Sequence, residues 1–438
     1  MNIPFSNTPL PNVQPGGVLE YDYRPFHKSG DTSSSRLKML QWNIERNYEA
    51  EGIIEKIKDL DPDVCVLQEV DIGCRRSGNR NHMEELCRQL KMKGVFVCEF
   101  WELDDPIRED RDAGGGFHGN AILTKYDIAD IRILNHQHES FHWERDGISL
   151  KEPRKGKRYT LAATIKRFAL PPVLLYCVHL EVFTGIIGRV SAFSEILEDA
   201  QIHSNIPHQA IFGDLNTMAH SIARLSPKFA RDRYRLLSLG ESESTWFDRN
   251  ILGHHVMDGP INTRLLTMER PLWQPLWFLK WMVTNNSNGF LQQWGRFLGY
   301  LLTGFSAVIM VKARNPGFYD GWPLDYDTLH NPAHFGLFKA KLDWTLLRNM
   351  AIHNRQVGNA DYKLSDHQYL MVDVEMDDDD LALDANRSYA TWLLRRNQIH
   401  DKKNTSNGGG ASDLTGMLMD LIVILVLVYS CVYLFHLF

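Results

Sequence analysis

Short apolar runs that end in polar residues recur through the middle of the chain, and this pattern is typical of buried β-strands. Apolar residues at helical spacing interleave with these runs, at residues 51–60 and 190–201 among other places. Because strands and helices alternate without a strict βαβ order, the pattern predicts an α+β body built from stacked sheets. The strands are expected at residues 37–42, 64–68, 120–123, 159–165, 173–180, 209–212, 344–347 and 369–374.

Polar sequence borders this body on both sides. Residues 1–36 are rich in Pro, Asn and Ser and contain the stretch SGDTSSS, which predicts a disordered leader before a globular body at residues 37–376. Residues 377–413 combine an acidic run with the Gly/Ser-rich stretch KKNTSNGGGAS. This composition predicts a flexible juxtamembrane linker.

An apolar segment follows at residues 414–438, in which Asp420 is the only formally charged residue. A bilayer core takes about 20 apolar residues, so the segment is long enough to be a transmembrane tail anchor. A buried core helix is the less favoured interpretation, because the flexible linker separates the segment from the body. Lys402 and Lys403 precede it, and the positive-inside tendency then places the body in the cytosol. Among organelles we expect the endoplasmic reticulum first.

A second apolar region lies inside the body, at residues 271–311. Trp273, Trp277 and Trp281 recur at every fourth residue and would share one helix face, and residues 297–311 carry no charge. One interpretation is a buried helical pair that extends the core. The other is an insert that enters the lipid interface, where tryptophan side chains prefer to lie.

Composition and charge argue against several functional classes. The formal net charge of −6 provides no global basic field that would draw the chain to nucleic acid. The six cysteines form no C-x-x-C pair, which argues against a structural zinc site. The N-terminus lacks the basic start and apolar run of a signal peptide, so we expect the body to face a reducing, cytosolic environment.

Five short polar motifs stand at the ends of predicted strands, and each carries side chains that phosphate chemistry uses. Carboxylates and amides bind Mg²⁺ or orient water, and histidines exchange protons or bind phosphate oxygens. Each motif alone is weak evidence, because an Asn at a strand end is usually a turn residue and a lone His usually a core residue. The motifs are QWNI (residues 41–44), LQEVD (67–71), VHLE (178–181), GDLNT (213–217) and LSDHQ (364–368).

In this order the motifs resemble those of the endonuclease/exonuclease/phosphatase superfamily. Its members include deoxyribonuclease-like nucleases, neutral sphingomyelinases, inositol-polyphosphate 5-phosphatases and deadenylases. The resemblance covers residues 37–375 and includes Gly119 and Asn120 before the strand AIL, and Asp343 and Trp344 before TLL. It implies a four-layer α/β sandwich, with two sheets face to face and helices outside. It also implies a metal-dependent hydrolase of phosphoric esters.

The resemblance, together with residue type, implies a site for Mg²⁺, with Mn²⁺ as the alternative. Glu69 would bind the ion directly, because Mg²⁺ takes one or two carboxylates and keeps several waters. Asn43, at the preceding strand end, would bind near the ion or to a phosphate oxygen. Asp366 matches an acidic residue that contributes to metal binding in the superfamily.

The resemblance also implies a set of catalytic residues. Asp214 would orient or deprotonate the attacking water, and Asn216, on the same face of an extended segment, would donate a hydrogen bond to the phosphate. His367 would bind the phosphate or exchange its proton, with Asp343 fixing its tautomer. His179 stands where the superfamily carries His or Tyr and is a second acid–base or phosphate-binding candidate. The general base among Asp214, His179 and His367 stays open.

Two further features carry competing interpretations. Asn120 is a candidate ligand of the substrate phosphate, and a turn residue before a strand is the alternative. Arg75, Arg76 and Arg80, with the basic run at residues 151–158, would contact a second phosphate or anionic lipid headgroups. The alternative for the basic run is a solvated hairpin.

Three functional hypotheses follow. The first is a Mg²⁺-dependent phosphodiesterase acting on a membrane phospholipid or sphingolipid, similar in type to neutral sphingomyelinases. It rests on the tail anchor, the Trp-rich insert and the His of VHLE, although sphingomyelinases usually carry HLH where this chain has Glu181 in the last position. The second is a membrane-tethered nuclease or nucleotide phosphodiesterase, which the acidic net charge favours less. The third, a non-enzymatic interaction protein, is disfavoured because every expected catalytic position is filled.

Overall fold

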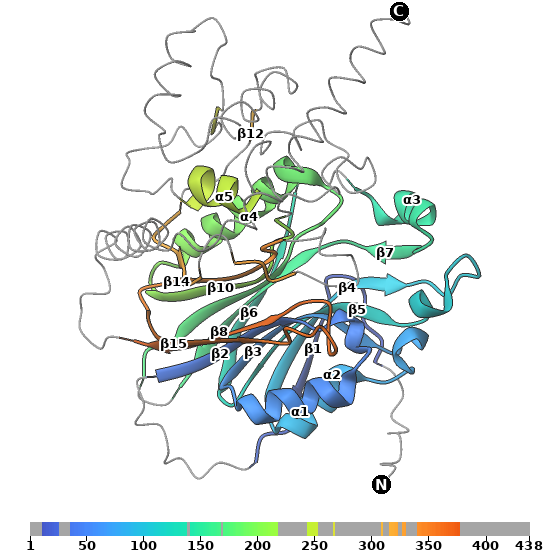
Figure 1. Cartoon of the computed structure of the whole chain (residues 1–438), viewed down its shortest axis with the longest axis horizontal. Helices are drawn as coiled ribbons and strands as arrows, with labels where there is room; N and C mark the ends of the chain where they lie inside the picture. The colour runs from blue at the N-terminus through green and yellow to red at the C-terminus, as the bar shows by residue number, and fades with distance from the viewer. Residues whose placement is uncertain are drawn as a thin grey trace, which may run out of the picture.

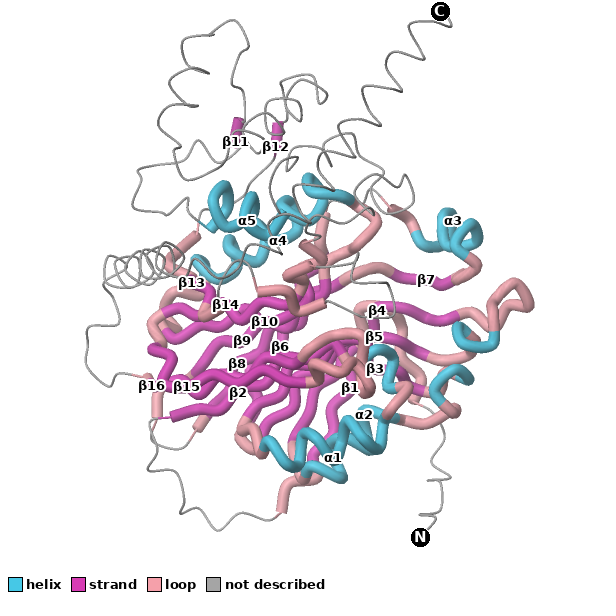
Figure 2. Tube along the Cα trace, viewed as in Figure 1, coloured by secondary structure: helices cyan, strands magenta, loops and turns pink. Residues whose placement is uncertain are grey.

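Two β-sheets packed face to face form the body of the chain (Figures 1 and 2). The structure is a computed structural model of the 438-residue chain. It describes residues 11–25, 36–137, 141–167, 170–217, 243–252, 266–267, 308–309, 315–322, 326–329 and 340–376.

The first sheet has the strand order β1-β4-β5-β3-β2-β16-β15, and β7 pairs with the far end of β4. Its strands β2 and β3 are parallel, while its other pairs are antiparallel. The strands are β1 (Val18–Asp22), β2 (Arg36–Asn43), β3 (Val64–Ile72), β4 (Lys93–Glu102), β5 (Phe117–Thr124), β7 (Arg154–Gly156), β15 (Ala351–Gly358) and β16 (Tyr369–Glu375).

The second sheet has the order β13-β14-β10-β9-β8-β6, with β9 and β10 parallel. A separate pair of short strands, β11 (Leu266–Thr267) and β12 (Val308–Ile309), lies within residues 266–309. The strands of the second sheet are β6 (Asp127–Asn135), β8 (Tyr159–Lys166), β9 (Val173–His179), β10 (His208–Asp214), β13 (Tyr319–Asp320) and β14 (Asp343–Arg348).

Helices cover the outer face of each sheet, which gives four layers (Figure 2). Helices α1 (Ala50–Leu60) and α2 (His82–Leu90) pack on the first sheet, and α4 (Gly185–Ile202) and α5 (Glu243–Phe247) pack on the second. The expected arrangement of two packed sheets is confirmed. The remaining helical turns are Glu45–Asn47, Arg75–Ser77, Asp110–Asp112, α3 (Trp143–Asp146), Gly147–Leu150 and the π-helical turn Asp248–Leu252.

Strict alternation of side chains decides which residues lie between the sheets. On β2, Leu37 and Met39 join the core between the sheets, whereas Leu40 and Trp42 face α1 and α2. Because side chains alternate with a period of two, a run that is apolar at every position can be buried on both faces. The predicted strands are therefore continuous apolar runs, and the structure confirms each of them with bounds that differ by a few residues.

Sequence patterning missed the strands whose apolar run is interrupted. Strand β4 begins at Lys93 and carries Glu99 and Glu102, both fully buried, which hides the strand in a hydropathy pattern. Strand β6 is half exposed along most of its length, and β15 is exposed at several consecutive positions. Buried charge and solvated edges both weaken the periodic signal that identifies a strand.

The expectation of a disordered leader over residues 1–36 is wrong for Val18–Asp22. These residues form β1, which pairs antiparallel with β4 at the edge of the first sheet. Val13, before the turn at Pro15 and Gly16, is buried against the outer core of the same sheet. The Pro and Gly residues just before the strand are typical of linkers, and for this reason the sequence pattern predicted disorder here.

Two predicted apolar segments fall outside the residues that the structure describes. They are the tail at residues 414–438 and the insert at residues 271–311, apart from the strand β12. Within the described ranges, no helix is long and apolar enough to cross a membrane.

The assignment of β1 predicts a role in stability for part of the N-terminal segment. Deleting residues 1–25 removes β1 and the buried Val13, and we expect the free energy of unfolding to fall by roughly 2 kcal/mol or more, since burial of a Val side chain alone contributes about 1.5–3 kcal/mol. Deleting only residues 1–10 removes no described contact and is the control. Equal denaturant midpoints for the two truncated proteins would contradict the assignment of β1 as a structural strand.

Candidate active site

Polar side chains replace the apolar core where the inner faces of both sheets reach one edge of the sandwich. On β9 and β10 the inner positions Cys177 and Phe212 belong to the core between the sheets, and the next inner positions are His179 and Asp214. Strands β9 and β10 lie over β2, β3 and β5, so polar ends from both sheets meet. The buried polar residues at this edge are Gln41, Asn43, Gln68, Asp71, Glu99, His118, Asn120, His179, Asp214, Asp343 and His367.

A bulge in β3 directs Glu69 into this edge. The register with β5 shifts between Leu67 and Val70, and Glu69 within the shift has a φ of 61°. A left-handed backbone at a non-glycine residue costs about 1–3 kcal/mol and persists only where surrounding structure enforces it. The strained bulge therefore places the Glu69 carboxylate where a regular strand could not place it.

A left-handed turn after β2 brings a second carboxylate to the same place. Glu45, Arg46 and Asn47 have φ values of 43°, 58° and 57°. The turn lets the Glu45 backbone N–H donate to Oδ1 of Asn43, and Oε2 of Glu45 accepts from the backbone N–H of Asp366 at 2.9 Å. Three consecutive residues in this conformation indicate a strained segment that packing holds in place.

Three carboxylates, Glu45, Glu69 and Asp366, repel one another at this position. Burial and then the charges of Asp366 and Glu69 raise the pKa of Glu45 to about 7. Burial raises the pKa of Asp366, and the charge of Glu69 adds to the effect. Burial alone would raise the pKa of Glu69, but the electrostatic effects of His118 and of the Arg46 guanidinium outweigh it and hold that pKa below its usual range.

This group of side chains has the donor chemistry that Mg²⁺ prefers, namely carboxylate oxygens beside an amide. Glu69, Asp366, Glu45 and Asn43 could hold the ion. Across the described part of the chain, no group of three or more His, Cys, Asp or Glu side chains is already arranged to hold a metal ion. The assignment of Mg²⁺ or Mn²⁺ to these residues therefore stays a prediction.

Asp214 lies at the centre of the site. Its Oδ2 is 3.2 Å from Nδ2 of Asn43, 3.6 Å from Nε2 of His179 and 3.8 Å from Nε2 of His367. Burial raises the pKa of Asp214 to about 7, with Asp343 adding to the increase and His367 opposing it. Gly213 before it has no room for a side chain, because a Cβ there would lie 1.9 Å from the Val178 carbonyl oxygen.

His367 is held by a carboxylate, as the sequence predicted. Its Nδ1 is 2.8 Å from Oδ2 of Asp343, and Asp343 also accepts from Nε2 of Gln41 at 3.0 Å. Burial alone would lower the pKa of His367, but Asp343 and Asp366 outweigh it and hold the pKa well above its usual range. These carboxylates therefore favour the charged form of the ring, whose Nε2 lies 3.8 Å from Oδ2 of Asp214.

Asn216 and Asn120 have different surroundings. Asn216, with a φ of 51°, donates its backbone N–H to Oδ1 of Asp214 at 2.8 Å, and its side-chain Nδ2 donates to the Leu180 carbonyl at 2.8 Å. One amide hydrogen of Asn216 stays available for the predicted phosphate contact. Asn120 lies inside β5, so the alternative of a turn residue is wrong. Its amide is fully buried, and neither polar atom has a partner among the described residues.

Several predicted surface arginines are instead buried in ion pairs. Arg76, which was expected to contact a second phosphate, is fully buried and donates to Asp71 at 2.7 Å and to Glu102 at 3.1 Å. Arg154 and Arg158, in the basic run at 151–158, are also buried, so the solvated-hairpin alternative is wrong for these two residues. An uncompensated buried charge is costly, and this explains why each arginine faces a carboxylate.

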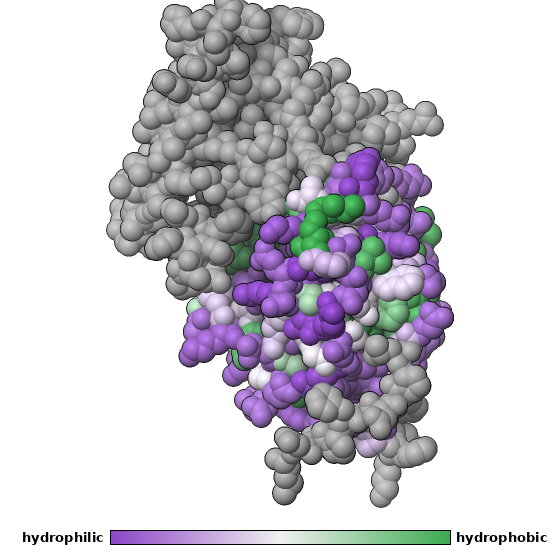
Figure 3. All heavy atoms as spheres, turned by 90° about the vertical axis from the view of Figure 1, so that its right-hand side faces the viewer, coloured by the Kyte–Doolittle hydropathy of each residue, from purple (hydrophilic) through white to green (hydrophobic). Residues whose placement is uncertain are grey.

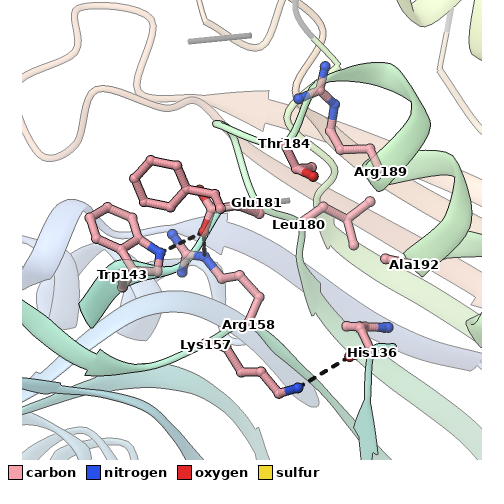
Figure 4. Close-up of a pocket in the computed structure, with 11 residues that line it drawn as sticks. His136, Trp143, Lys157, Arg158, Leu180, Glu181, Thr184, Arg189 and Ala192 are labelled. Carbon is pink, nitrogen blue, oxygen red and sulfur yellow. Dashed lines mark hydrogen bonds and ion pairs between the residues drawn. The ribbon is translucent and has the colours of Figure 1, made fainter. Parts of the chain in front are cut away.

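A pocket lies beside Arg158, between the β7–β8 connection, α3 and the start of α4. Figure 4 shows Trp143 and Arg158 both turned toward Glu181. Nε1 of Trp143 donates to Oε2 of Glu181 at 2.7 Å, and Nε of Arg158 lies 3.7 Å from the same oxygen. Glu181, the last residue of VHLE, therefore links the pocket to the strand that carries His179.

The sequence pointed to most of the convergent residues and missed three. The structure brings Asn43, Glu69, Asp214, Asp343 and His367 together, along with His179, Asn216, Asp366 and Asn120. The three missed residues are Glu45, Gln41 and Arg158. They contact Asp366, Asp343 and His179, respectively. Glu45 follows Asn43 by two residues, so its carboxylate beside the QWNI motif was a usable signal, whereas Arg158 lay in a run that resembles a solvated turn.

A sequence model of the Endonuclease/Exonuclease/phosphatase family matches residues 40–367, which is most of the chain. The chain belongs to this family. Its members are phosphoester hydrolases, and this supports a hydrolase here. No curated protein sequence matches the chain.

Several solved structures are similar to the chain. An endonuclease/exonuclease/phosphatase from Beutenbergia cavernae has 15% identity, covers 78% of this chain and 72% of its own, and gives a TM-score of 0.40. A family member from Bacteroides vulgatus has 12% identity, coverage of 78% and 100%, and a TM-score of 0.43. TDP2 of D. rerio, complexed with a single-strand DNA product, has 13% identity, coverage of 78% and 100%, and a TM-score of 0.40.

The carboxylate repulsion predicts how the metal-free protein responds to pH. Glu45 has a folded-state pKa of about 7, above its unfolded value, so its stabilising contribution is present at low pH and is lost as pH rises through about 7. We expect the melting temperature of the chelated full-length protein to fall between about pH 5 and pH 8. MgCl₂ should restore it more at pH 8 than at pH 6, because bound cation displaces protons.

Glu45→Gln is the matched variant for this measurement. It keeps the side-chain shape and removes one negative charge, so it should melt higher than the wild type at pH 8 without metal, by roughly 2–4 °C for each kcal/mol of repulsion relieved. It should also gain less from MgCl₂. A variant that melts lower than the wild type in chelator and gains equally from MgCl₂ would show that Glu45 does not belong to the cation site.

Proposed function

We propose that the chain is a divalent-metal-dependent phosphodiesterase that acts on a phospholipid or sphingolipid while attached to a membrane. The observation that carries the hydrolase part is the convergence of Asp214, His367 with Asp343, and the carboxylates around Glu69 at one edge of the sandwich. The family match supports the same class of reaction. The lipid substrate and the metal are the proposed extensions.

The environment of each group supports a division of roles. Asp214, with a pKa near 7, would act as the general base that takes a proton from the attacking water. His367, held charged by Asp343, would act as an acid or bind a phosphate oxygen through Nε2. Groups whose surroundings move their pKa values apart are the usual acid–base pair of an active site.

The other polar groups would bind and orient the phosphate. Asn120, with an unpartnered buried amide among the described residues, and the free amide hydrogen of Asn216 would donate to its oxygens. Mg²⁺, when bound by Glu69 with Asn43, Asp366 and Glu45, would neutralise charge on the phosphate and on the leaving oxygen.

The proposed membrane attachment rests on the apolar segment at residues 414–438. Figure 3 shows a face of the described body that is mainly hydrophilic, with separate apolar patches. Within the described ranges, the exposed large hydrophobic side chains are Tyr23, Trp101, Ile107, Ile148 and Ile202. Such separated side chains are ordinary for a protein surface, so we assign attachment to the tail. The proposed location is the cytosolic face of the endoplasmic reticulum.

Substitutions at the acid–base pair test the hydrolase assignment. Asp214→Ala and His367→Ala should each lower kcat by about 10²–10⁴-fold, the range for a positioned proton-transfer group. Asp343→Asn should cost less, because Asp343 acts through His367. Asp361→Asn, which removes an exposed carboxylate paired with Lys363, is the control and should change nothing. Wild-type rates in the Asp214 and His367 variants would remove the site assignment.

A substrate series tests the lipid proposal. The full-length protein with Mg²⁺ is assayed against sphingomyelin vesicles, phosphoinositide vesicles, a single-stranded oligonucleotide and a soluble aryl phosphodiester. We expect a vesicle substrate to be hydrolysed fastest, and excess chelator or Glu69→Gln to abolish turnover. Rapid cleavage of the oligonucleotide with intact lipids would instead favour the tethered nuclease.

Removal of residues 414–438 tests the anchor in the same series. The truncated protein should leave the membrane fraction and hydrolyse the soluble aryl phosphodiester at the full-length rate, while its rate on vesicles falls. A truncated protein that stays on membranes, with its vesicle rate unchanged, would contradict the anchor and transfer attachment to another segment.

A further inference from the structure

His179 is held by an arginine, whereas His367 is held by a carboxylate. Nη1 of Arg158 lies 3.0 Å from Nδ1 of His179 and 2.6 Å from Oε2 of Glu99. Arg158 directly precedes β8 and His179 ends β9, so the contact joins neighbouring strands of the second sheet. Arg158 and His179 are buried, with side chains 10% and 3% exposed.

The chemistry of the guanidinium decides which nitrogen of His179 carries the proton. An arginine side chain only donates hydrogen bonds, while each imidazole nitrogen donates or accepts according to its protonation. Nδ1 of His179 must therefore accept from Arg158, and the single proton of the neutral ring lies on Nε2. A doubly protonated ring would point an N–H at the guanidinium. Burial and then the charge of Arg158 hold the pKa of His179 well below its usual range, in agreement with a neutral ring.

The protonated nitrogen is the one that faces the site. Nε2 of His179 is 3.6 Å from Oδ2 of Asp214, the same oxygen that His367 approaches to 3.8 Å. Two imidazoles thus face one carboxylate, His179 from the end of β9 and His367 from the loop before β16. His367 is paired with an acceptor and His179 with a donor, so the two rings differ in charge and cannot perform the same step.

We propose that Arg158 is a positioning residue that holds His179 as a neutral Nε2–H donor, which binds an oxygen of the phosphate or of the leaving group. In this arrangement His179 neither takes up nor releases a proton during turnover. The inference deepens the proposed function and rests on it. Glu99, which is fully buried, completes the arrangement by neutralising Arg158, and it also accepts from the Tyr159 backbone N–H at 3.2 Å.

Arg158 also forms part of the pocket wall in Figure 4, where its guanidinium reaches toward Glu181. Lys157 lines the same pocket, and its Nζ donates to the carbonyl oxygen of His136 at 3.3 Å. Lys157→Gln removes the same unit of charge from the pocket and leaves the contact between Arg158 and His179 in place. It is the matched control for substitutions of Arg158.

Replacement of His179 by amides tests the donor role. The amide nitrogen of Gln reaches the place of Nε2, whereas that of Asn reaches only the place of Nδ1. His179→Ala should lower kcat by about 10²–10³-fold, the cost of removing one donor to a developing negative charge. His179→Gln should recover at least about tenfold of this loss, and His179→Asn should not. Equal losses in the Gln and Ala variants would overturn the proposal, because an amide cannot replace an acid or a base.

A double-mutant cycle tests the part assigned to Arg158. Arg158→Met should lower kcat by about 10–100-fold at similar KM, the range for partners that orient a functional imidazole, and Lys157→Gln by less than about twofold. In the His179→Ala background, Arg158→Met should cost almost nothing further, because its effect acts through the ring. Additive losses would assign Arg158 to stability alone. Arg158→Lys, which keeps a charge beside Glu99, provides a folded variant if the Met variant melts.

A spectroscopic measurement separates this inference from the proposed function. In the full-length protein with ¹⁵N-labelled histidine, the His179 ring should show an unprotonated Nδ1 and a protonated Nε2 from about pH 5 to pH 8, with the signal identified by its loss in His179→Gln. Arg158→Met should abolish this preference, and Lys157→Gln should keep it. The result needs no substrate, so a titrating or Nδ1-protonated ring would overturn the inference even if phosphodiesters are hydrolysed.

Discussion

The need to compensate buried charge governs the whole edge of the sandwich where the two sheets end. An ion removed from water costs several kcal/mol unless a partner faces it, and this edge contains both carboxylates and arginines with little access to water. On the side of β3, β4 and β5, arginines face the buried carboxylates: Arg76 faces Asp71 and Glu102, and Arg158 faces Glu99, whose pKa burial still raises to about 7. On the side of β2 and the loop before β16, Asp366, Glu45 and Glu69 stand together, and raised pKa values of Glu45 and Asp366 record the deficit. An added cation would relieve that deficit, so the same constraint that builds the arginine network agrees with the predicted position of Mg²⁺ at these carboxylates.

Backbone strain concentrates at the same edge. Glu45, Arg46, Asn47, Glu69 and Asn216 all adopt left-handed conformations that non-glycine residues rarely take. At about 1–3 kcal/mol each, these conformations persist only because the surrounding structure is well packed. Three buried clusters surround them, one between the sheets and one on each outer face. The bulky, regular core therefore offsets the strain of a few positions that direct carboxylates and an amide toward a common centre.

Strand position could be read from the sequence because it depends on local order, and the motifs at the strand ends, through their resemblance to the superfamily, pointed to polar side chains that the structure brings together. A strand buried on both faces is a continuous apolar run, and its last inner residue becomes polar where the core ends, as at His179 and Asp214. The pairing of buried charges between residues far apart in the chain cannot be read from the local sequence pattern. Glu99 and Glu102 interrupt β4 and hide it, yet they pair with Arg158 and Arg154, more than fifty residues along the chain. Arg158 looked like part of a solvated turn for the same reason, since its partners lie on other strands. The short strand β1 was hidden by Pro and Gly beside it.

The partners of the two histidines separate roles that residue type alone left open. Three groups, Asp214, His179 and His367, could each have been the base. In the proposed arrangement, His179 is neutral and already carries its proton on the nitrogen that faces the site, so it would not accept another there. A His367 ring that Asp343 keeps protonated would have no free electron pair, which argues against His367 as well. Asp214 is then the proposed base, with its Oδ2 3.6 Å and 3.8 Å from the two rings and with a pKa of about 7 that suits proton transfer near neutral pH. This proposal rests on the different partners of the two imidazoles, an arginine for His179 and a carboxylate for His367.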